Sequence, residues 1–300
     1  MTWLSDAAVA RLRDVADRPD FTGTKYEIIE RAGQGGMASV YVARDKDLDR
    51  KVAVKVIHAP VVDPHVQQRM LAEARIIARL EHPGILPVHD MGFLPDGRIY
   101  YAMKLVHGLR LDSFIEKTPL LPERLRVFLK VCDAVAFAHS QGVIHRDLKP
   151  SNVMIGDFGE VLVIDWGLAK TEDPETLAGV IMGTPGHMAP EQEHGRIDAI
   201  TERTDVYGLG ILLHSLLIPG ASNSLRAISS KATSVSPSDR YPNVSELARD
   251  VNRFLGGERV TAFPERFWET ASRLVARHRT FVILIATYLA VRVILLLVAR

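Results

Sequence analysis

Eight consecutive residues near the middle of the sequence carry groups suited to one kind of chemistry. The string HRDLKPSN at positions 145–152 supplies a carboxylate at Asp147, an ammonium at Lys149 and an amide at Asn152. Phosphoryl transfer needs a carboxylate near the attacking hydroxyl, a cation near the transferred group and oxygen ligands for Mg²⁺. Because a chance occurrence of the whole string is negligible, we interpret it as the centre of a phosphoryl-transfer site.

Two earlier features fit the binding of phosphates. The run GQGGMASV at positions 33–40 is rich in glycine, which lets backbone amides approach phosphate oxygens, although a glycine-rich hairpin is the simpler interpretation of this run alone. Lys55 ends the apolar run VAVK, where an ammonium is costly unless it meets an anion. Glu73 on the following predicted helix is a candidate partner for Lys55, and a solvated helix face is the alternative for it.

The order of predicted elements places these groups. The chain from Tyr26 alternates like β-strands, a helix is predicted over residues 65–80, and two further strands are predicted near 85–91 and 99–106. Beyond Gly108 the pattern is mostly helical through residue 255, interrupted by a hairpin at 153–164. The pattern predicts an α+β fold in which a small β-rich lobe and a larger α-helical lobe meet at a cleft.

These motifs, together with MAPE at positions 188–191, occur in an order that resembles the eukaryotic-like (Hanks-type) serine/threonine protein kinases, which bacteria also possess. The resemblance covers about residues 26–255 and implies the two-lobed protein kinase fold, with an N-lobe at 26–105 and a C-lobe at 106–255. It implies ATP and Mg²⁺, or Mn²⁺, as cofactors and a protein serine or threonine as the phosphate acceptor. Lys149, two residues after Asp147, resembles the serine/threonine version of this loop rather than the tyrosine version.

The resemblance also implies a role for each matching position. Asp147 would orient the substrate hydroxyl, Lys149 would steady the γ-phosphate, and Lys55 would contact the α- and β-phosphates while pairing with Glu73. Val40, Ala53 and Met154 would enclose the adenine, and Met103 would precede the hinge, residues 104–106. The implied nucleotide-binding set is Ala32, Gly33, Gln34, Gly35, Gly36, Met37, Ala38, Ser39, Val40, Ala53, Lys55, Lys104, Val106 and Met154.

Two aspartates compete for the second metal ligand beside Asn152. Asp157 belongs to a DFG string, the form the family favours, but it follows Asn152 by only five residues and falls in the predicted hairpin turn. Asp165 begins DWG, thirteen residues after Asn152, where the second hairpin strand returns to the cleft. We therefore assign the metal to Asn152 and Asp165. Trp166 replaces the phenylalanine of the family string, and we expect this change to alter how freely the segment changes its packing.

Residues 165–191 would form the activation segment. Arg146 resembles the arginine that pairs with a phosphate on this segment, for which Thr171 and Thr176 are candidates. A carboxylate of Glu172, Asp173 or Glu175 is the alternative partner for Arg146. The resemblance further implies that Thr184 bonds Asp147 and Lys149, that Arg240 pairs with Glu191, and that Asp205 and Gly210 anchor the C-lobe.

Two departures separate the chain from the family pattern. Ala38 replaces the third loop glycine, at small expected cost. The stretch between Gly210 and Arg240 is short, so a helix that commonly docks substrates is reduced or missing. A pseudokinase scaffold and a small-molecule kinase are the alternative functions. The intact chemical groups argue against a pseudokinase, and the MAPE string argues against a small-molecule kinase.

The composition and the two ends of the chain carry further predictions about binding partners and location. A formal net charge of +1 gives no field that would attract nucleic acid, and a single cysteine, Cys132, fits a reducing compartment and core packing better than a catalytic thiol. Residues 1–25 are predicted as a helix and linker, 256–279 as a basic juxtamembrane segment and 280–299 as a transmembrane helix that leaves the kinase domain in the cytoplasm. A helix docked on the C-lobe of a cytoplasmic protein is the alternative, because Arg292 would cost about 2.5–3.5 kcal/mol at the membrane centre.

Overall fold

The computed structural model describes residues 19–35, 38–58, 75, 77–166 and 184–264, together with 284–285, 287–288 and 291–292. The predicted N-terminal helix, most of the predicted helix at 65–80 with Glu73, the loop residues Gly36 and Met37, and the candidate phosphosites Thr171 and Thr176 lie outside this set. Most of segment 280–299 lies outside it as well. Within the described residues, no helix is both long enough and apolar enough to cross a membrane.

The chain divides into two compact units that interleave along the sequence. The first contains Met1–Lys117, Asp133–Arg146 and Pro150–Ala178, and the second contains Thr118–Cys132, Asp147–Lys149 and Gly179–Arg300. The long helix α4 (Leu121–Ser140) therefore contributes its first part to the second unit and its last part to the first.

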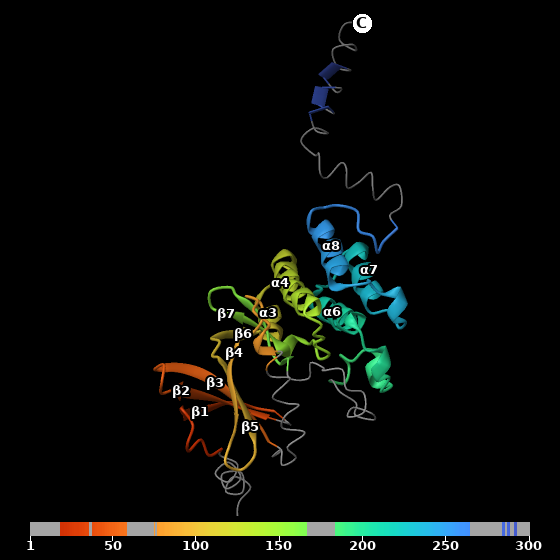
Figure 1. The fold of residues 1–300 in the computed structure, drawn as a ribbon. Helices are drawn as coiled ribbons and strands as arrows, with labels where there is room; N and C mark the ends of the chain where they lie inside the picture. The colour runs from red at the N-terminus through yellow and green to blue at the C-terminus, as the bar shows by residue number, and fades with distance from the viewer. Residues whose placement is uncertain are drawn as a thin grey trace, which may run out of the picture. The chain divides into compact units, whose positions relative to one another are not determined.

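A five-stranded antiparallel sheet dominates the first unit (Figure 1). Its strands follow the order β1-β2-β3-β5-β4, in which every neighbouring pair is antiparallel. Short connections and runs of β-branched and aromatic residues favour this arrangement. The strands are β1 (Tyr26–Gln34), β2 (Ala38–Asp45), β3 (Arg50–Ile57), β4 (Val88–Phe93) and β5 (Ile99–Lys104).

The two faces of this sheet differ because side chains alternate along each strand. Val52, Val54 and Val56 of β3 are buried in an apolar cluster with residues of the other strands, whereas Ala53 and Lys55 project from the opposite face. The cluster contains Phe21, Tyr26, Tyr41, Ala43, Val52, Val54, Val56, Leu94, Tyr100 and Ala102. This core fixes the orientation of β3 and leaves its other face for the site.

The rest of the first unit includes a three-stranded sheet in the order β6-β7-β8, with β6 (Gly108–Arg110), β7 (Val153–Gly156) and β8 (Val161–Val163). Helix α3 (Leu111–Lys117) follows β6, and the short 3-10 turn η1 (Pro150–Asn152) precedes β7. Strand β4 begins at Val88, three residues later than predicted. Pro87 has no N–H for a strand ladder, and Ile85 instead forms a single bridge with Val163.

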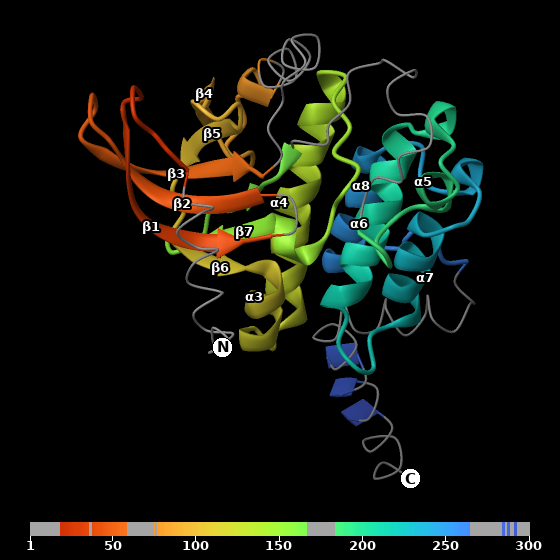
Figure 2. The ribbon, with the colours of Figure 1, turned by 90° about the horizontal axis from the view of Figure 1, so that it is seen from below.

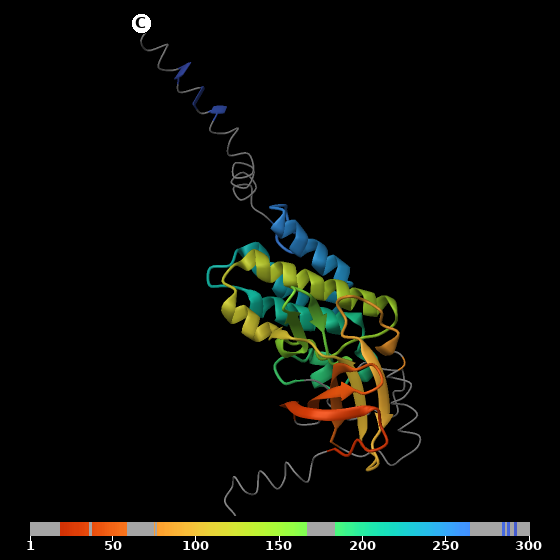
Figure 3. The same cartoon turned by 90° about the vertical axis from the view of Figure 1, so that its left-hand side faces the viewer.

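The second unit is helical. Figures 2 and 3 show α6 (Glu202–Leu216), α7 (Asn223–Ala232) and α8 (Val244–Leu255) packed against one another. Side chains of Thr201, Ser222 and Asn243 accept backbone N–H bonds at the three helix starts, which satisfies amides that lack a partner within the helix. The shorter elements are α5 (Pro190–Glu193), η4 (Ile197–Ala199) and η5 (Pro237–Asp239).

Helix α7 follows α6 after the short connection at 217–222 and packs closely against it. Gly210 of α6 lies so near α7 that an added Cβ would meet the Cβ of Ala232 and the Cγ2 of Thr233, each at 2.7 Å. The Ser229 hydroxyl also donates to the Gly210 carbonyl at 3.0 Å. The predicted helix order through residue 255 and the predicted α+β fold are confirmed.

Candidate active site

One face of the five-stranded sheet carries several of the predicted nucleotide-binding residues. Val40 of β2 lies opposite Lys55 of β3, and Ala53 of β3 lies opposite Met103 of β5. Side chains of directly opposed residues lie on the same side of a sheet. Val40, Ala53, Lys55 and Met103 therefore share the face opposite the apolar core, and this face brings the Lys55 ammonium together with three apolar side chains.

Lys55 forms an ion pair with Asp165, although the two residues are far apart in sequence. The side chains are 24% and 42% exposed, so the pair remains accessible to a ligand. Glu73, the partner expected from the sequence, lies outside the described residues. The ion pair joins the predicted phosphate-binding cation to a predicted metal ligand within the first unit.

The glycine-rich loop is anchored on both sides of Gly36 and Met37. The Gly35 amide donates to the Ala38 carbonyl at 2.8 Å. Ser39 is almost fully buried, and its hydroxyl lies 2.9 Å from Nε2 of His58 at the end of β3. Ala32, Gly33 and Gln34 belong to the end of β1, with Gly33 opposite Val40. The loop therefore leaves and re-enters a regular sheet.

Asn152 and Asp165 are connected through the backbone, because the Ile164 amide donates to the Asn152 carbonyl at 2.9 Å. Asn152 is buried, and Asp165 has a left-handed backbone with φ 64°. An amide oxygen and a carboxylate are the hard oxygen ligands that Mg²⁺ prefers, and Mg²⁺ usually takes few protein ligands beside phosphates and water. The donor set thus fits the implied metal.

Asp157, the other aspartate considered, lies in the turn between β7 and β8. Phe158 beside it is 98% exposed, and Gly159 adopts φ 79°, which completes the turn. A hydrogen bond from the backbone of Glu160 itself holds the pKa of its carboxyl below the ordinary value, and the Phe158 amide, which also donates to this carboxylate, adds to the effect. The placement supports Asp165 rather than Asp157 as the metal ligand.

The predicted hinge residues continue from β5. The Lys104 amide donates to the Pro87 carbonyl at 3.1 Å, and its ammonium lies 3.7 Å from Glu160. Within the described part of the chain, no hydrogen bond involves the backbone of Val106. Met154 lies in β7, opposite Arg110 and Leu162. The backbone of Val106 can therefore form a hydrogen bond with a nucleotide base.

The second unit holds the groups predicted to act on the acceptor. The Lys149 ammonium donates to one carboxylate oxygen of Asp147 at 2.7 Å. The other oxygen accepts from the Thr184 hydroxyl at 2.9 Å and from the Thr184 amide at 3.1 Å, while Lys149 also donates to the Thr184 hydroxyl. Three donors from two residues, Lys149 and Thr184, thus fix the orientation of one largely buried carboxylate.

Two further observations concern the residues on either side of Asp147. Arg146, which precedes Asp147, is buried in the first unit and has a left-handed backbone with φ 70°. In the second unit, Gly208 of α6 lies against Leu148, and an added Cβ would be 3.1 Å from the Leu148 Cβ. Helix α6 thus contacts the residue between Asp147 and Lys149, so packing on α6 helps position both.

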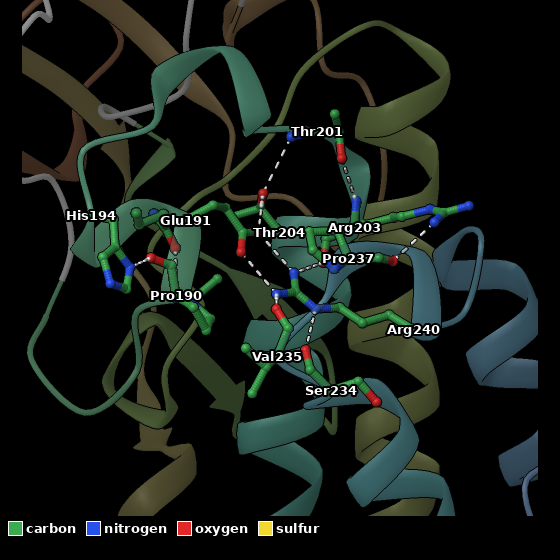
Figure 4. Close-up of polar contacts among 12 residues, drawn as sticks. Pro190, Glu191, His194, Thr201, Arg203, Thr204, Ser234, Val235, Pro237 and Arg240 are labelled. Carbon is green, nitrogen blue, oxygen red and sulfur yellow. Dashed lines mark hydrogen bonds and ion pairs between the residues drawn. The ribbon is translucent and has the colours of Figure 1, made fainter.

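A buried ion pair holds the last residue of the predicted activation segment (Figure 4). Arg240 donates to both carboxylate oxygens of Glu191, at 2.7 and 2.8 Å, and Thr204 donates to the same carboxylate at 2.9 Å. Burial raises the pKa of Glu191, but hydrogen bonds from Arg240, the backbone and Thr204 outweigh this effect and lower the pKa overall. Carbonyls of Arg203, Ser234 and Val235 accept the remaining N–H groups of Arg240.

Comparison with known protein families shows to which family the chain belongs. Residues 26–255 match the model of the protein kinase domain. The chain belongs to the protein kinase family. The predicted protein kinase fold and the predicted resemblance to bacterial Hanks-type serine/threonine kinases are both confirmed. The similar proteins are bacterial serine/threonine-protein kinases and a bacterial kinase domain.

Two curated relatives and one solved structure illustrate the similarity of this kinase. It is 34% identical to serine/threonine-protein kinase PknD of Protochlamydia amoebophila over 77% of this chain, and 33% identical to PknD of Chlamydia trachomatis over 85%. The chain spans about a third of the length of these relatives, 30% and 33%. The crystal structure of the Mycobacterium tuberculosis PknI kinase domain has a TM-score of 0.62 and 26% identity, covering 79% of this chain and 98% of that one.

Sequence reasoning missed several contacts of this kinase site. It gave no role to His58, which contacts Ser39, or to Gly208, which contacts Leu148. It expected Trp166 to alter how freely its segment changes packing, but it did not predict that the indole is buried and hydrogen-bonded to the Val163 carbonyl. A histidine just after the VAVK strand and a tryptophan in place of phenylalanine were the available signals, but their partners are set by folding.

Proposed function

We propose that this chain is an ATP-dependent serine/threonine protein kinase that transfers the γ-phosphate of ATP to protein hydroxyls, including its own. The observation that carries the proposal is the cluster of Asp147, Lys149 and Thr184, in which one carboxylate is oriented by three donors. A carboxylate held in this way can align an acceptor hydroxyl, and the adjacent ammonium can neutralise charge on the transferred group.

The nucleotide is held by residues of the first unit. Val40, Ala53 and Met154 contact the adenine, and the backbone at Lys104 and Val106 bonds its polar edge. The glycine-rich loop residues 32–40 surround the phosphates, and Lys55 binds the α- and β-phosphates. The support for these roles is the shared sheet face and the Lys55–Asp165 ion pair.

Asp147 orients the serine or threonine hydroxyl and accepts its proton as the oxygen attacks. The bond from that oxygen to the γ-phosphorus forms while the bond from the γ-phosphorus to the β–γ bridging oxygen breaks, so ADP leaves with that electron pair. Lys149 offsets the negative charge on the transferred phosphoryl group. Asn152 and Asp165 would hold Mg²⁺, which when bound neutralises phosphate charge and aligns the β- and γ-phosphates.

A membrane anchor in segment 280–299 is a second part of the proposed function. The segment is apolar except at a few positions. Four of its described residues are each 51–61% exposed: Leu284, Ile285, Tyr288 and Val291. Exposed apolar side chains in succession are expected where lipid or another apolar surface covers them. Flotation of the full chain with liposomes, compared with a variant carrying Leu284→Lys and Val291→Lys, tests this part. Equal flotation of both proteins would exclude the anchor.

The test of kinase activity is transfer of labelled phosphate from ATP by the full chain with Mg²⁺ or Mn²⁺, compared with Asp147→Asn. Transfer to the chain itself or to a generic protein, lost in the variant, is the expected result, with phosphoserine or phosphothreonine as the product. Nucleotide binding without any transfer would instead indicate a pseudokinase scaffold. Transfer only to small metabolites would indicate a small-molecule kinase.

A further inference from the structure

Asp165 adopts a backbone conformation that residues other than glycine rarely occupy. Its φ is 64°, in the left-handed region where the Cβ crowds the backbone. Such a conformation persists only when the surrounding structure over-determines it. The contacts on either side of Asp165 therefore decide whether its carboxylate stays directed at Lys55.

The residues before Asp165 are fixed by hydrogen bonds to three separate segments. The Val163 amide donates to the Gly84 carbonyl at 2.8 Å, and the Val163 carbonyl accepts from the Leu86 amide at 3.1 Å. The Ile164 amide donates to the Asn152 carbonyl, and the Ile164 carbonyl lies 3.0 Å from Nε2 of His145. The chain thus enters Asp165 from two residues whose backbone groups are hydrogen-bonded to other segments.

The residue after Asp165 is fixed by its own side chain. Trp166 is only 3% exposed, and its indole N–H donates to the Val163 carbonyl at 3.1 Å. Its ring also meets the His145 ring edge-on, with centroids 4.7 Å apart. Because the indole reaches back over three residues, its hydrogen bond closes a ring around Asp165.

We infer that Trp166 is a positioning residue for Asp165, acting through the indole hydrogen bond to Val163. Phenylalanine at this position could fill the same space and meet His145, but it has no donor and would leave the turn open. The N–H specifically holds Asp165 in its left-handed conformation, with the carboxylate directed at Lys55. This inference rests on the proposed function, in which Asp165 is a metal ligand for the bound nucleotide.

The hydrogen bond is tested first, without reference to activity. The full chain labelled with [¹⁵N]tryptophan has three indole N–H signals, from its three tryptophans, and Trp3→Phe and Trp268→Phe assign the third by elimination. The Trp166 indole proton should exchange with deuterium at least tenfold more slowly than an exposed indole. Exchange at the rate of an exposed indole would overturn the inference.

The positioning role is tested by the Mg²⁺ dependence of binding of a fluorescent ATP analogue, which does not require phosphate transfer. Loss of one neutral hydrogen bond shifts a local equilibrium by about fivefold, so Trp166→Phe should raise the half-saturating Mg²⁺ concentration about fivefold. The matched control is Ile99→Val, which removes one buried methylene from β5 in the same unit and should leave this concentration unchanged.

The outcomes separate this inference from the proposed function. A protected indole with a shifted Mg²⁺ dependence supports the positioning role, even if the wild-type chain transfers no phosphate. A protected indole with unchanged Mg²⁺ dependence in Trp166→Phe overturns it and leaves the indole a purely structural contact. If Trp166→Phe does not fold, Trp166→Tyr replaces it, because tyrosine keeps an aromatic ring but cannot place a donor at the indole position.

Discussion

Thr184 donates both its hydroxyl and its backbone amide to a single carboxylate oxygen of Asp147, at 2.9 and 3.1 Å. The same hydroxyl accepts a hydrogen bond from Lys149, so one threonine connects the two groups that the proposed reaction uses. Thr184 reaches them from a segment 37 residues away in the sequence. The orientation of Asp147 therefore depends on how the end of the activation segment is placed.

Replacing Thr184 with alanine should lower kcat by up to about 100-fold, because a small misplacement of a catalytic group costs that much. The KM for ATP should change little, since the nucleotide residues belong to the first unit. Initial rates of phosphate transfer at varied ATP measure both parameters. Thr184→Ser, which keeps the hydroxyl, is the control and should retain most of the activity. A kcat for Thr184→Ala equal to that of the serine variant would contradict the role of this hydroxyl.

The two candidate aspartates can be separated directly. Asp165→Ala should abolish metal-dependent transfer, whereas Asp157→Ala should stay within about twofold of wild type, as is usual for a surface substitution. The reason is that Asp165 pairs with Lys55, while Asp157 lies in a hairpin turn beside an exposed phenylalanine. Transfer rates at a series of Mg²⁺ concentrations provide the measurement. An inactive Asp157→Ala protein with wild-type stability would reverse the assignment.

Gly210→Ala should destabilise the helical unit. Alanine is the better helix former by about 1 kcal/mol, but its Cβ would lie 2.7 Å from the Cβ of Ala232 in α7 and 2.7 Å from the Cγ2 of Thr233, which follows α7. Overpacking of this kind costs about 1–3 kcal/mol. We expect the steric term to prevail, because Ala232 is fully buried and cannot move aside. Urea unfolding measures the difference. Gly256→Ala is the control, since its nearest contact would be an ordinary 3.5 Å, and equal stabilities of the two variants would refute the expected clash.

Glu191 makes stability depend on pH in a defined direction. Its pKa in the folded protein lies below the ordinary value of 4.5, so its ion pair with Arg240 contributes fully above pH 4.5 and is lost as the pH falls through the lowered native pKa. Glu191→Gln should lower the free energy of unfolding at pH 7 by about 3–5 kcal/mol, because it leaves a buried guanidinium without its counter-ion.

Urea unfolding at a series of pH values between 3 and 7 tests both statements for Glu191. The wild-type protein should lose stability toward acid more steeply than Glu191→Gln, which has no carboxyl to protonate at this position. The exposed neighbour Glu193 offers the matched control, and Glu193→Gln should behave like wild type. Parallel pH profiles for wild type and Glu191→Gln would show that the pair does not titrate as described.

Asp250 fixes the segment that follows α8. Its carboxylate accepts from the Tyr241 hydroxyl at 2.8 Å, from the amide and hydroxyl of Thr261 at 2.8 and 2.6 Å, and from the Ala262 amide at 3.0 Å. In Asp250→Asn, the side-chain NH2 replaces one acceptor oxygen and cannot accept bonds from these donors. Hydrogen exchange of the Thr261 and Ala262 backbone amides should therefore accelerate at least tenfold. Thr261→Val removes one of the four bonds and should have a smaller effect. Unchanged exchange in Asp250→Asn would show that other contacts hold the segment.

Local patterns were sufficient to predict the parts of the protein that neighbouring residues decide. Alternation around VAVK predicted a strand that contains Lys55, and glycines with short polar runs predicted the hairpin whose turn contains Asp157. The predicted pairing of Arg240 with Glu191 and the contact of Thr184 with Asp147 are also present in the structure. Those two came from the family resemblance and not from local pattern.

By itself, the sequence determined the family, the order of the elements and the chemical groups at the site, because these depend on residue type and spacing along the chain. Only the tertiary structure decided the side-chain contacts that no motif implied. The bonds of Ser39 with His58, of Trp166 with Val163 and of Asp250 with Thr261 require particular backbone turns and rotamers. A hydrogen bond forms only within a few tenths of an ångström and a limited angle, and that geometry is set by how the surrounding core packs rather than by the residues' own identities.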